Sequence, residues 1–193
     1  MTRKLLVSIA TAAAVLLSAD AASAQMPPDP APRIAAQTEA MKKLSMMDGT
    51  WRGSAWTATP GGKHELTQTE RVGPLLGGAV KVVEGRGYNA DGSTSFNALA
   101  IIGFEPDTGA YTLHSHAMGR KGDFKLAPTG DGFVWEVPAG PMTIRYTATI
   151  KDGTWTEIGE RVVPGQAPVK FFEMNLKRLG DTTWPAAGAV GLK

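Results

Sequence analysis

The sequence predicts an all-β protein, an antiparallel up-and-down barrel of about ten strands with a short N-terminal helix. From Gly49 onward, apolar and polar residues alternate with a period of two, as expected for strands with one buried face. Residues that favour turns recur between these segments, which is typical of hairpin-connected strands. A sheet of about ten strands would expose two unpaired edges unless it closed on itself, so a barrel is the economical arrangement.

The N-terminus has the pattern of a secretory signal peptide, predicted over residues 1–24. A basic start precedes the apolar segment from Leu5 to Leu17, and Ala22-Ser23-Ala24 supplies the small residues that signal peptidase accepts. We therefore expect a periplasmic or secreted protein. The apolar segment is shorter than the roughly 20 residues that span a bilayer, so no membrane insertion is expected.

A proline-rich linker is predicted at residues 25–33, which contain four prolines in nine positions. A single helix-capped domain follows over residues 34–180. Its first segment is an amphipathic helix at 34–47, because its apolar residues fall near one helical face and would cover an open end of the sheet. The small, glycine-rich residues 181–193 are predicted to form a flexible tail.

Ten strands are predicted between recurring turn signals. Sequences such as "NADGS" (89–93) and "KDG" (151–153) contain residues that tolerate positive φ and suit tight hairpins. Alternation is clearest where Phe96, Ala98, Ala100, Ile102 and Phe104 share one face. The predicted strands are 50–58, 64–72, 79–87, 95–104, 109–117, 120–127, 132–138, 141–150, 154–163 and 168–178.

Composition excludes several classes of protein. The chain has 20 basic and 18 acidic residues, with no basic run, which argues against a nucleic-acid partner. It has no cysteine, so disulfides, a lipid-anchoring cysteine and C-x-x-C-H haem attachment are ruled out. Stability must therefore come from the core, and we expect no cofactor.

Gly49-Thr50-Trp51, after a short helix, resembles the G-x-W entry of lipocalins and related calycins. The resemblance implies that Trp51 packs across the closed base of the barrel, and that a basic residue at the end of the last strand covers the indole. Arg178 is the preferred candidate and Lys177 the alternative. A large indole in that place would bury about 200 Å², and a stacked guanidinium would add about 1 kcal/mol.

Four further segments extend the resemblance over most of residues 44–178. The chain is similar to a bacterial family of exported domains of unknown function with a calycin-like barrel, of the lipocalin and fatty-acid-binding-protein type. These motifs concern turns and packing, and they imply a fold without naming a reaction. The segments are "LSMMDGTWRGSA", "ERVGPLLGGAV", "GFEPDTGAYTLHS" and "FFEMNLKR".

The predicted lumen is the candidate functional site. Apolar and amphipathic residues on successive strands could line a pocket for a small hydrophobic molecule, while their hydroxyl and indole groups orient it. The same residues could instead fill the core, because an interior of this size is either packed or hollow. The candidate ligand-binding residues are Tyr111, Trp135, Met142, Ile144 and Tyr146.

Catalytic and metal sites have weaker support, and none is predicted. His114 and His116 share a strand face, but no third metal ligand has a defined position, and His64 is distant in sequence. Some small calycin-like barrels bind haem through a histidine on a late strand, whereas the last histidine here is His116, in mid-barrel. The serines lack a nucleophile-elbow context such as G-x-S-x-G.

Carboxylate pairs are a further candidate for acid/base chemistry. Glu157 with Glu160, or Glu136 with Glu173, could serve, but charged residues on strands more often face solvent.

Three hypotheses for the function follow: a binding module for a small, mostly apolar ligand, an isomerase or hydrolase that uses a lumen His or Glu, and a filled barrel with a structural or interaction role. The side-chain direction on strand 109–117 discriminates between them.

Overall fold

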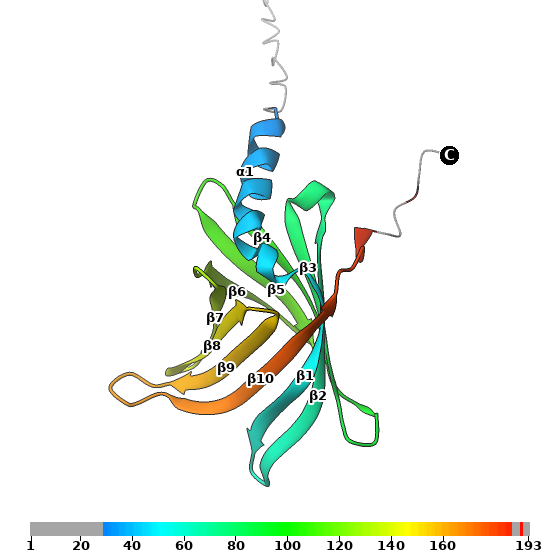
Figure 1. Cartoon of the computed structure of the whole chain (residues 1–193). Helices are drawn as coiled ribbons and strands as arrows, with labels where there is room; N and C mark the ends of the chain where they lie inside the picture. Colours follow the sequence, from blue (N-terminus) through cyan, green and yellow to red (C-terminus); the bar gives the residue numbers. More distant parts are fainter. Residues whose placement is uncertain (1–28, 187–189, 191–193) are drawn as a thin grey trace, which may run out of the picture.

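The computed structural model describes residues 29–186 and residue 190, which form a closed antiparallel β-barrel preceded by a helical segment (Figure 1). Each strand pairs with its neighbours in sequence, and β1 pairs with β10 to close the barrel. The predicted fold and its ten strands are confirmed, with strand ends within three residues of the predicted ones. The strands are β1 (Gly49–Thr59), β2 (Gly62–Leu75), β3 (Val80–Tyr88), β4 (Thr94–Glu105), β5 (Ala110–Ala117), β6 (Arg120–Pro128), β7 (Gly132–Ala139), β8 (Met142–Lys151), β9 (Thr154–Val162) and β10 (Val169–Gly180).

The helical segment covers one end of the barrel. It consists of α1 (Ala31–Met41) and the 3-10 helix η1 (Lys42–Met47). The helix begins at Ala31 rather than at Ile34, because a proline in the first turn needs no backbone N–H partner there and has a suitable φ. Residues 31–33, predicted as part of an extended linker, are therefore helical. Residues 1–28, including the predicted signal peptide, lie outside the described residues.

Polar contacts fix α1 to the barrel end. Arg33 forms ion pairs with Glu105 and Asp107 at the β4–β5 turn. The Tyr111 hydroxyl donates to the Ala40 carbonyl at 2.9 Å. The hairpins at the opposite end, including β1–β2 and β3–β4, are left uncovered (Figure 1).

A packed layer closes the barrel beneath the helices. The Trp51 side chain is 2% exposed, and its indole N–H donates to the Met47 carbonyl at 2.9 Å. Trp51 also meets the edge of Trp155, with ring centroids 5.7 Å apart. The largest fully buried side chains gather in this layer: Trp51, Leu44, Met47, Ile102, Leu176 and Val72.

Arg178 of β10 lies beside Trp51, which is its partner in the β1–β10 register. Its guanidinium carbon is 6.0 Å from the indole centroid, at the outer limit of a cation–π contact. The guanidinium also donates to the Asp48 carbonyl at 3.1 Å and forms an ion pair with Asp181. Arg178 therefore connects β10 to Asp48, the residue directly before β1.

Gly49 allows this close approach at the start of β1. Its φ is +126°, a conformation that disfavours other residues. A Cβ at this position would also lie 2.6 Å from the Gly180 carbonyl oxygen and 2.9 Å from an Arg178 nitrogen. The glycine of the G-x-W sequence is thus required by both backbone geometry and space.

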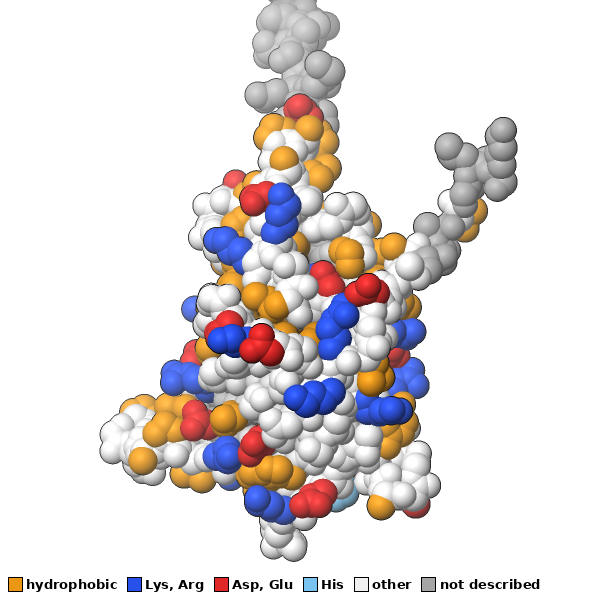
Figure 2. All heavy atoms as spheres, in the orientation of Figure 1, with side chains coloured by type: hydrophobic (Ala, Val, Ile, Leu, Met, Phe, Trp, Pro, Cys, Tyr) orange, Lys and Arg blue, Asp and Glu red, His pale blue; other side chains and the backbone are white. Residues whose placement is uncertain are grey.

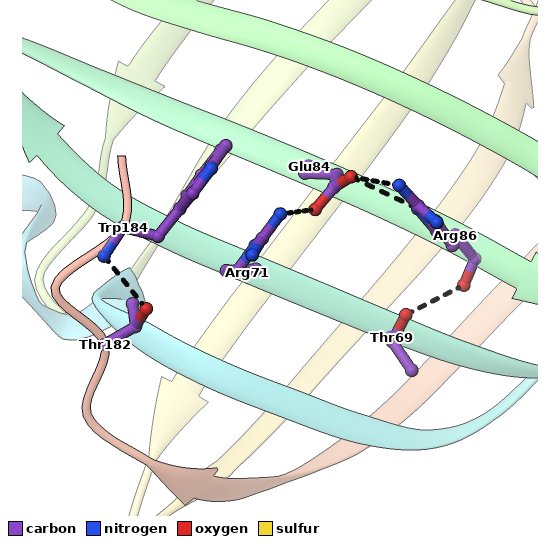
Figure 3. Close-up of polar contacts among 6 residues, drawn as sticks. All are labelled: Thr69, Arg71, Glu84, Arg86, Thr182 and Trp184. Carbon is purple, nitrogen blue, oxygen red and sulfur yellow. Dashed lines mark hydrogen bonds and ion pairs between the residues drawn. The ribbon is translucent and has the colours of Figure 1, made fainter. Parts of the chain in front are cut away.

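The segment after β10 packs on the outside of the barrel over residues 181–186, part of the tail predicted to be flexible. The Trp184 ring lies 4.3 Å from the Arg71 guanidinium, which also pairs with Glu84 (Figure 3). A Cβ on Gly73 would overlap the Trp184 carbonyl, so the glycine lets this segment touch β2. The bulky Trp184 therefore anchors residues that composition alone marks as loose.

Acidic and basic side chains are intermixed on the face of the barrel that Figure 2 presents. Within residues 29–186, no helix is both long enough and apolar enough to cross a membrane.

Replacing Trp51 tests its role in the closed end. Trp51→Ala removes a buried ring and the hydrogen bond to Met47, so we expect a loss of about 3–5 kcal/mol in the free energy of unfolding. Trp56→Ala is the matched control, because Trp56 is half-buried on the outer face of the same strand. Urea denaturation measures both variants, and equal losses would contradict a special role for Trp51.

Candidate functional site

A cavity of about 870 Å³ lies inside the barrel, between the packed layer and the uncovered end. Every strand contributes at least one lining residue. Met47, Phe133 and Trp155 line the cavity and also belong to the buried core, so they form its floor. The volume falls in the range of about 300–1,000 Å³ typical of small-molecule sites.

The side chains of β5 decide which residues reach this cavity. Leu113, Ser115 and Ala117 line it, whereas His114 and His116 are exposed on the outer face. His114 Nδ1 lies 2.8 Å from an oxygen of Asp123, whose side chain is also exposed. The histidine pair is therefore no part of the lumen. Residues 29–186 contain no cluster of three or more metal-ligating side chains of the His, Cys, Asp or Glu type.

Two of the predicted ligand-binding residues meet in the cavity wall. Trp135 of β7 and Tyr146 of β8 are register partners, and their rings stack with centroids 4.2 Å apart and planes 8° apart. Phe171 and Phe172 meet the Tyr146 ring at steep angles. These rings present a continuous aromatic wall to the lumen.

The other three predicted residues lie elsewhere along the barrel. Tyr111 faces inward but sits under α1, where it contacts Phe104 with ring centroids 4.8 Å apart. Met142 and Ile144 share the inward face of β8 with Tyr146 and are half-buried toward the β7–β8 turn. None of these three lines the cavity.

Glu157 projects into the lumen from β9. Its two carboxyl oxygens accept hydrogen bonds from the indole N–H groups of Trp135 at 3.0 Å and Trp155 at 3.3 Å. Burial raises the pKa of Glu157, and the indole bonds only partly offset this effect. The candidate pairing of Glu157 with Glu160 does not form in the lumen, because Glu160 occupies the opposite face of β9.

The other candidate carboxylate pair, Glu136 with Glu173, lies outside the lumen. Glu136 pairs with Arg145, whose Nε is 2.8 Å from the carboxylate. Glu173 is bound by Lys170 and Asn175, and these hydrogen bonds lower its pKa to about 2. Both residues form ion pairs on the outer face of the barrel, as expected for charged residues on strands.

Glu70 of β2 is a second carboxyl group in the lumen. Its Oε1 accepts a hydrogen bond from the Gln68 amide at 2.7 Å. Burial raises the pKa of Glu70 to about 8, and repulsion from Glu157 and Glu84 adds to the effect. Gly85 on the adjacent strand makes room, since a Cβ there would lie 2.8 Å from Oε1.

Sequence reasoning missed Gln68 and Glu70 because β2 is polar on both faces. His64, Leu66, Gln68 and Glu70 line the cavity, whereas the intervening residues of β2 face outward. His64 Nε2 lies 3.2 Å from the Ser95 hydroxyl. The only sequence signal was the position of Leu66 and Val72 on the same face as these polar residues.

The fold and site together define a closed ten-stranded antiparallel barrel with an internal cavity. No family model matches the sequence, and no curated protein matches it. The structure is similar to the crystal structure of Rv2717c from M. tuberculosis, with a TM-score of 0.55 and 16% sequence identity. The match covers 72% of this chain and 96% of that protein. At this identity the similarity establishes the shared fold.

The raised pKa of Glu70 predicts a pH-dependent stability. Between the ordinary glutamate pKa of 4.5 and about 8, the unfolded state releases a proton that the folded state retains. The free energy of unfolding should therefore fall as the pH rises through this window, by at most about 1.4 kcal/mol per pH unit from this group. The fall should level off above pH 8, where Glu70 is ionised in both states.

Glu70→Gln should reduce this fall, because the amide stays neutral. Glu65→Gln is the matched control on the outer face of β2 and should leave the fall intact. Urea denaturation at pH 5 and pH 8 measures the difference. The lowered pKa values of Glu84 and Glu173 affect stability only at more acidic pH. A fall of unchanged size in Glu70→Gln would contradict the assignment.

Proposed function

We propose that this protein is an exported, calycin-like binding module that takes a small, mostly apolar molecule into its lumen. The observation that carries the proposal is the cavity of about 870 Å³ with its stacked Trp135–Tyr146 wall. Export is inferred from the N-terminal sequence pattern, and a periplasmic or extracellular location follows from it.

The distribution of packing supports binding over a purely structural role. The fully buried side chains concentrate at the helix-covered end, whereas the rest of the lumen retains space for a ligand. Transfer of an apolar molecule into such a space is favourable by about 25 cal/mol per Å² of apolar surface buried. A filled barrel would lack this driving force.

An enzymatic role has less support. The two histidines that motivated it, His114 and His116, lie on the outer face. Glu70 and Glu157 remain in the lumen, and a carboxyl group with a pKa of about 8 can exchange protons near neutral pH. No nucleophile accompanies them among the residues bonded to either carboxyl group, so binding is the better interpretation.

Nile red, a neutral apolar fluorophore, tests the proposed function. We expect it to bind with enhanced, blue-shifted emission, because the lumen shields it from water. Ala98 lines the cavity on β4, so Ala98→Trp should fill the space and weaken binding by about tenfold, the effect of roughly 1.4 kcal/mol.

Leu99→Trp is the matched control, because Leu99 is the next residue on the same strand and is 43% exposed on the outer face. It should bind Nile red as the unaltered protein does. If Nile red does not bind, or if both variants bind it equally, the proposed function is wrong.

A further inference from the structure

The lumen contains two carboxyl groups without a basic partner. Neither Glu70 nor Glu157 forms an ion pair with a lysine, arginine or histidine in the described part of the chain. Their hydrogen-bond partners are an amide and two indoles, which are neutral. Elsewhere, Glu84 contacts Arg71 and Arg86, and the nearly buried Lys81 pairs with Asp48.

Buried charges in proteins are normally paired with an opposite charge, because leaving water costs them several kcal/mol. Glu84, on the outer face, follows this rule through Arg71 and Arg86. The two lumen carboxyl groups lack such a partner, and their raised pKa values keep them protonated to higher pH than usual. A cationic ligand would provide the counter-charge that the surrounding side chains lack.

Gln68 adds a further acceptor to the lumen beside Glu70. Its side chain is 5% exposed and lines the cavity next to Glu70. The amide nitrogen is used by Glu70 and by the Thr69 carbonyl, while the amide oxygen receives no hydrogen bond from the described residues. Because Gln68 lines the cavity, a ligand in the lumen can donate to this oxygen. A ligand with several N–H groups would satisfy this oxygen and the carboxyl oxygens together.

The aromatic wall adds a surface that suits a cation. Trp135 donates its N–H to Glu157 and stacks on Tyr146, so aromatic faces lie next to a carboxyl group. Cations are attracted to the faces of tryptophan and tyrosine rings, most strongly where water is excluded. The remaining lining is mainly apolar and accommodates the body of a ligand rather than its charge.

We propose that the lumen selects small amphipathic amines, with an apolar body against the aromatic wall and a protonated amine held by Glu70, Glu157 and the Gln68 amide oxygen. An ammonium group carries three N–H donors and no acceptor, which matches this set of acceptors. The inference rests on the proposed function, because it assumes that a small molecule occupies the cavity.

A carboxylate ligand is the opposing alternative. Arg120 and Lys121 line the cavity at its uncovered end and could hold an anionic head there. Both residues are exposed, so solvent screens their charges more than it screens the half-buried Glu70 and the buried Glu157. Deeper in the lumen, an anion would find no basic side chain paired with Glu70 or Glu157, whereas a cation would gain two carboxylate partners by displacing their protons. The amine is therefore the expected ligand class.

Displacement of Nile red by decylamine, decanol and decanoate at neutral pH tests the inference. The three compounds share one chain and differ in the head group, so their relative affinities report on the head-group site. We expect decylamine to bind at least about tenfold more tightly than decanol, a difference of about 1.4 kcal/mol, and decanoate to bind least tightly. The measurements are made below the concentrations at which these compounds aggregate.

Glu70→Gln and Glu157→Gln should each reduce the preference for decylamine over decanol, with decanol affinity little changed. Glu65→Gln on the outer face of β2 should keep the full preference. Nile red binding by each variant shows that its lumen is intact. If one variant does not fold, the other decides the result, because either carboxyl group alone should contribute to selection.

The outcomes separate the two proposals. Equal affinities for decylamine and decanol, or tighter binding of decanoate, overturn the amine inference but leave the binding function in place if Nile red still binds. A preference that survives both glutamate substitutions also overturns it. Failure of Nile red to bind in the lumen removes both proposals together.

Discussion

The pairing of β1 with β10 is the constraint on which the rest of the structure depends. It joins the first strand to the last over a register that runs from Thr50 with Gly180 to Thr57 with Phe172. Without this ladder the sheet would have two open edges and no enclosed lumen. The same pairing places Arg178 opposite Trp51, so closure of the sheet and closure of its helix-covered end occur at one place.

Closure at one end divides the interior into two regions with different roles. The layer that contains Trp51 and Leu44 is fully packed and supplies much of the hydrophobic burial. The region beyond Trp155 is hollow and carries the two lumen carboxyl groups, which oppose folding when they ionise. A stable packed layer lets the other region retain polar groups that a well-filled core would exclude.

The strands could be predicted because most have one apolar and one polar face. The alternation also placed Trp135 and Tyr146 on the apolar faces of their strands, which point inward, and left the direction of strand 109–117 open. A period of two shows which face of a strand a residue occupies, but it does not show how far along the barrel axis the residue lies. Depth separates Tyr111 under the helix and Met142 near the opposite turn from the Trp135–Tyr146 wall between them.

The acidic part of the site could not be predicted from alternation, because β2 has polar residues on both faces. Its direction is set by tertiary packing, which buries Val72 and brings Gln68 and Glu70 to the same side. The space for Glu70 comes from Gly85 on another strand. Nothing in the sequence around Gly85 indicates that this glycine leaves room for a side chain of β2. A carboxyl group and a facing glycine, each unremarkable in its own segment, become a site only when the sheet pairs β2 with β3. A polar residue on an inward strand position therefore gains significance when its cross-strand neighbour is small enough to leave it in the lumen.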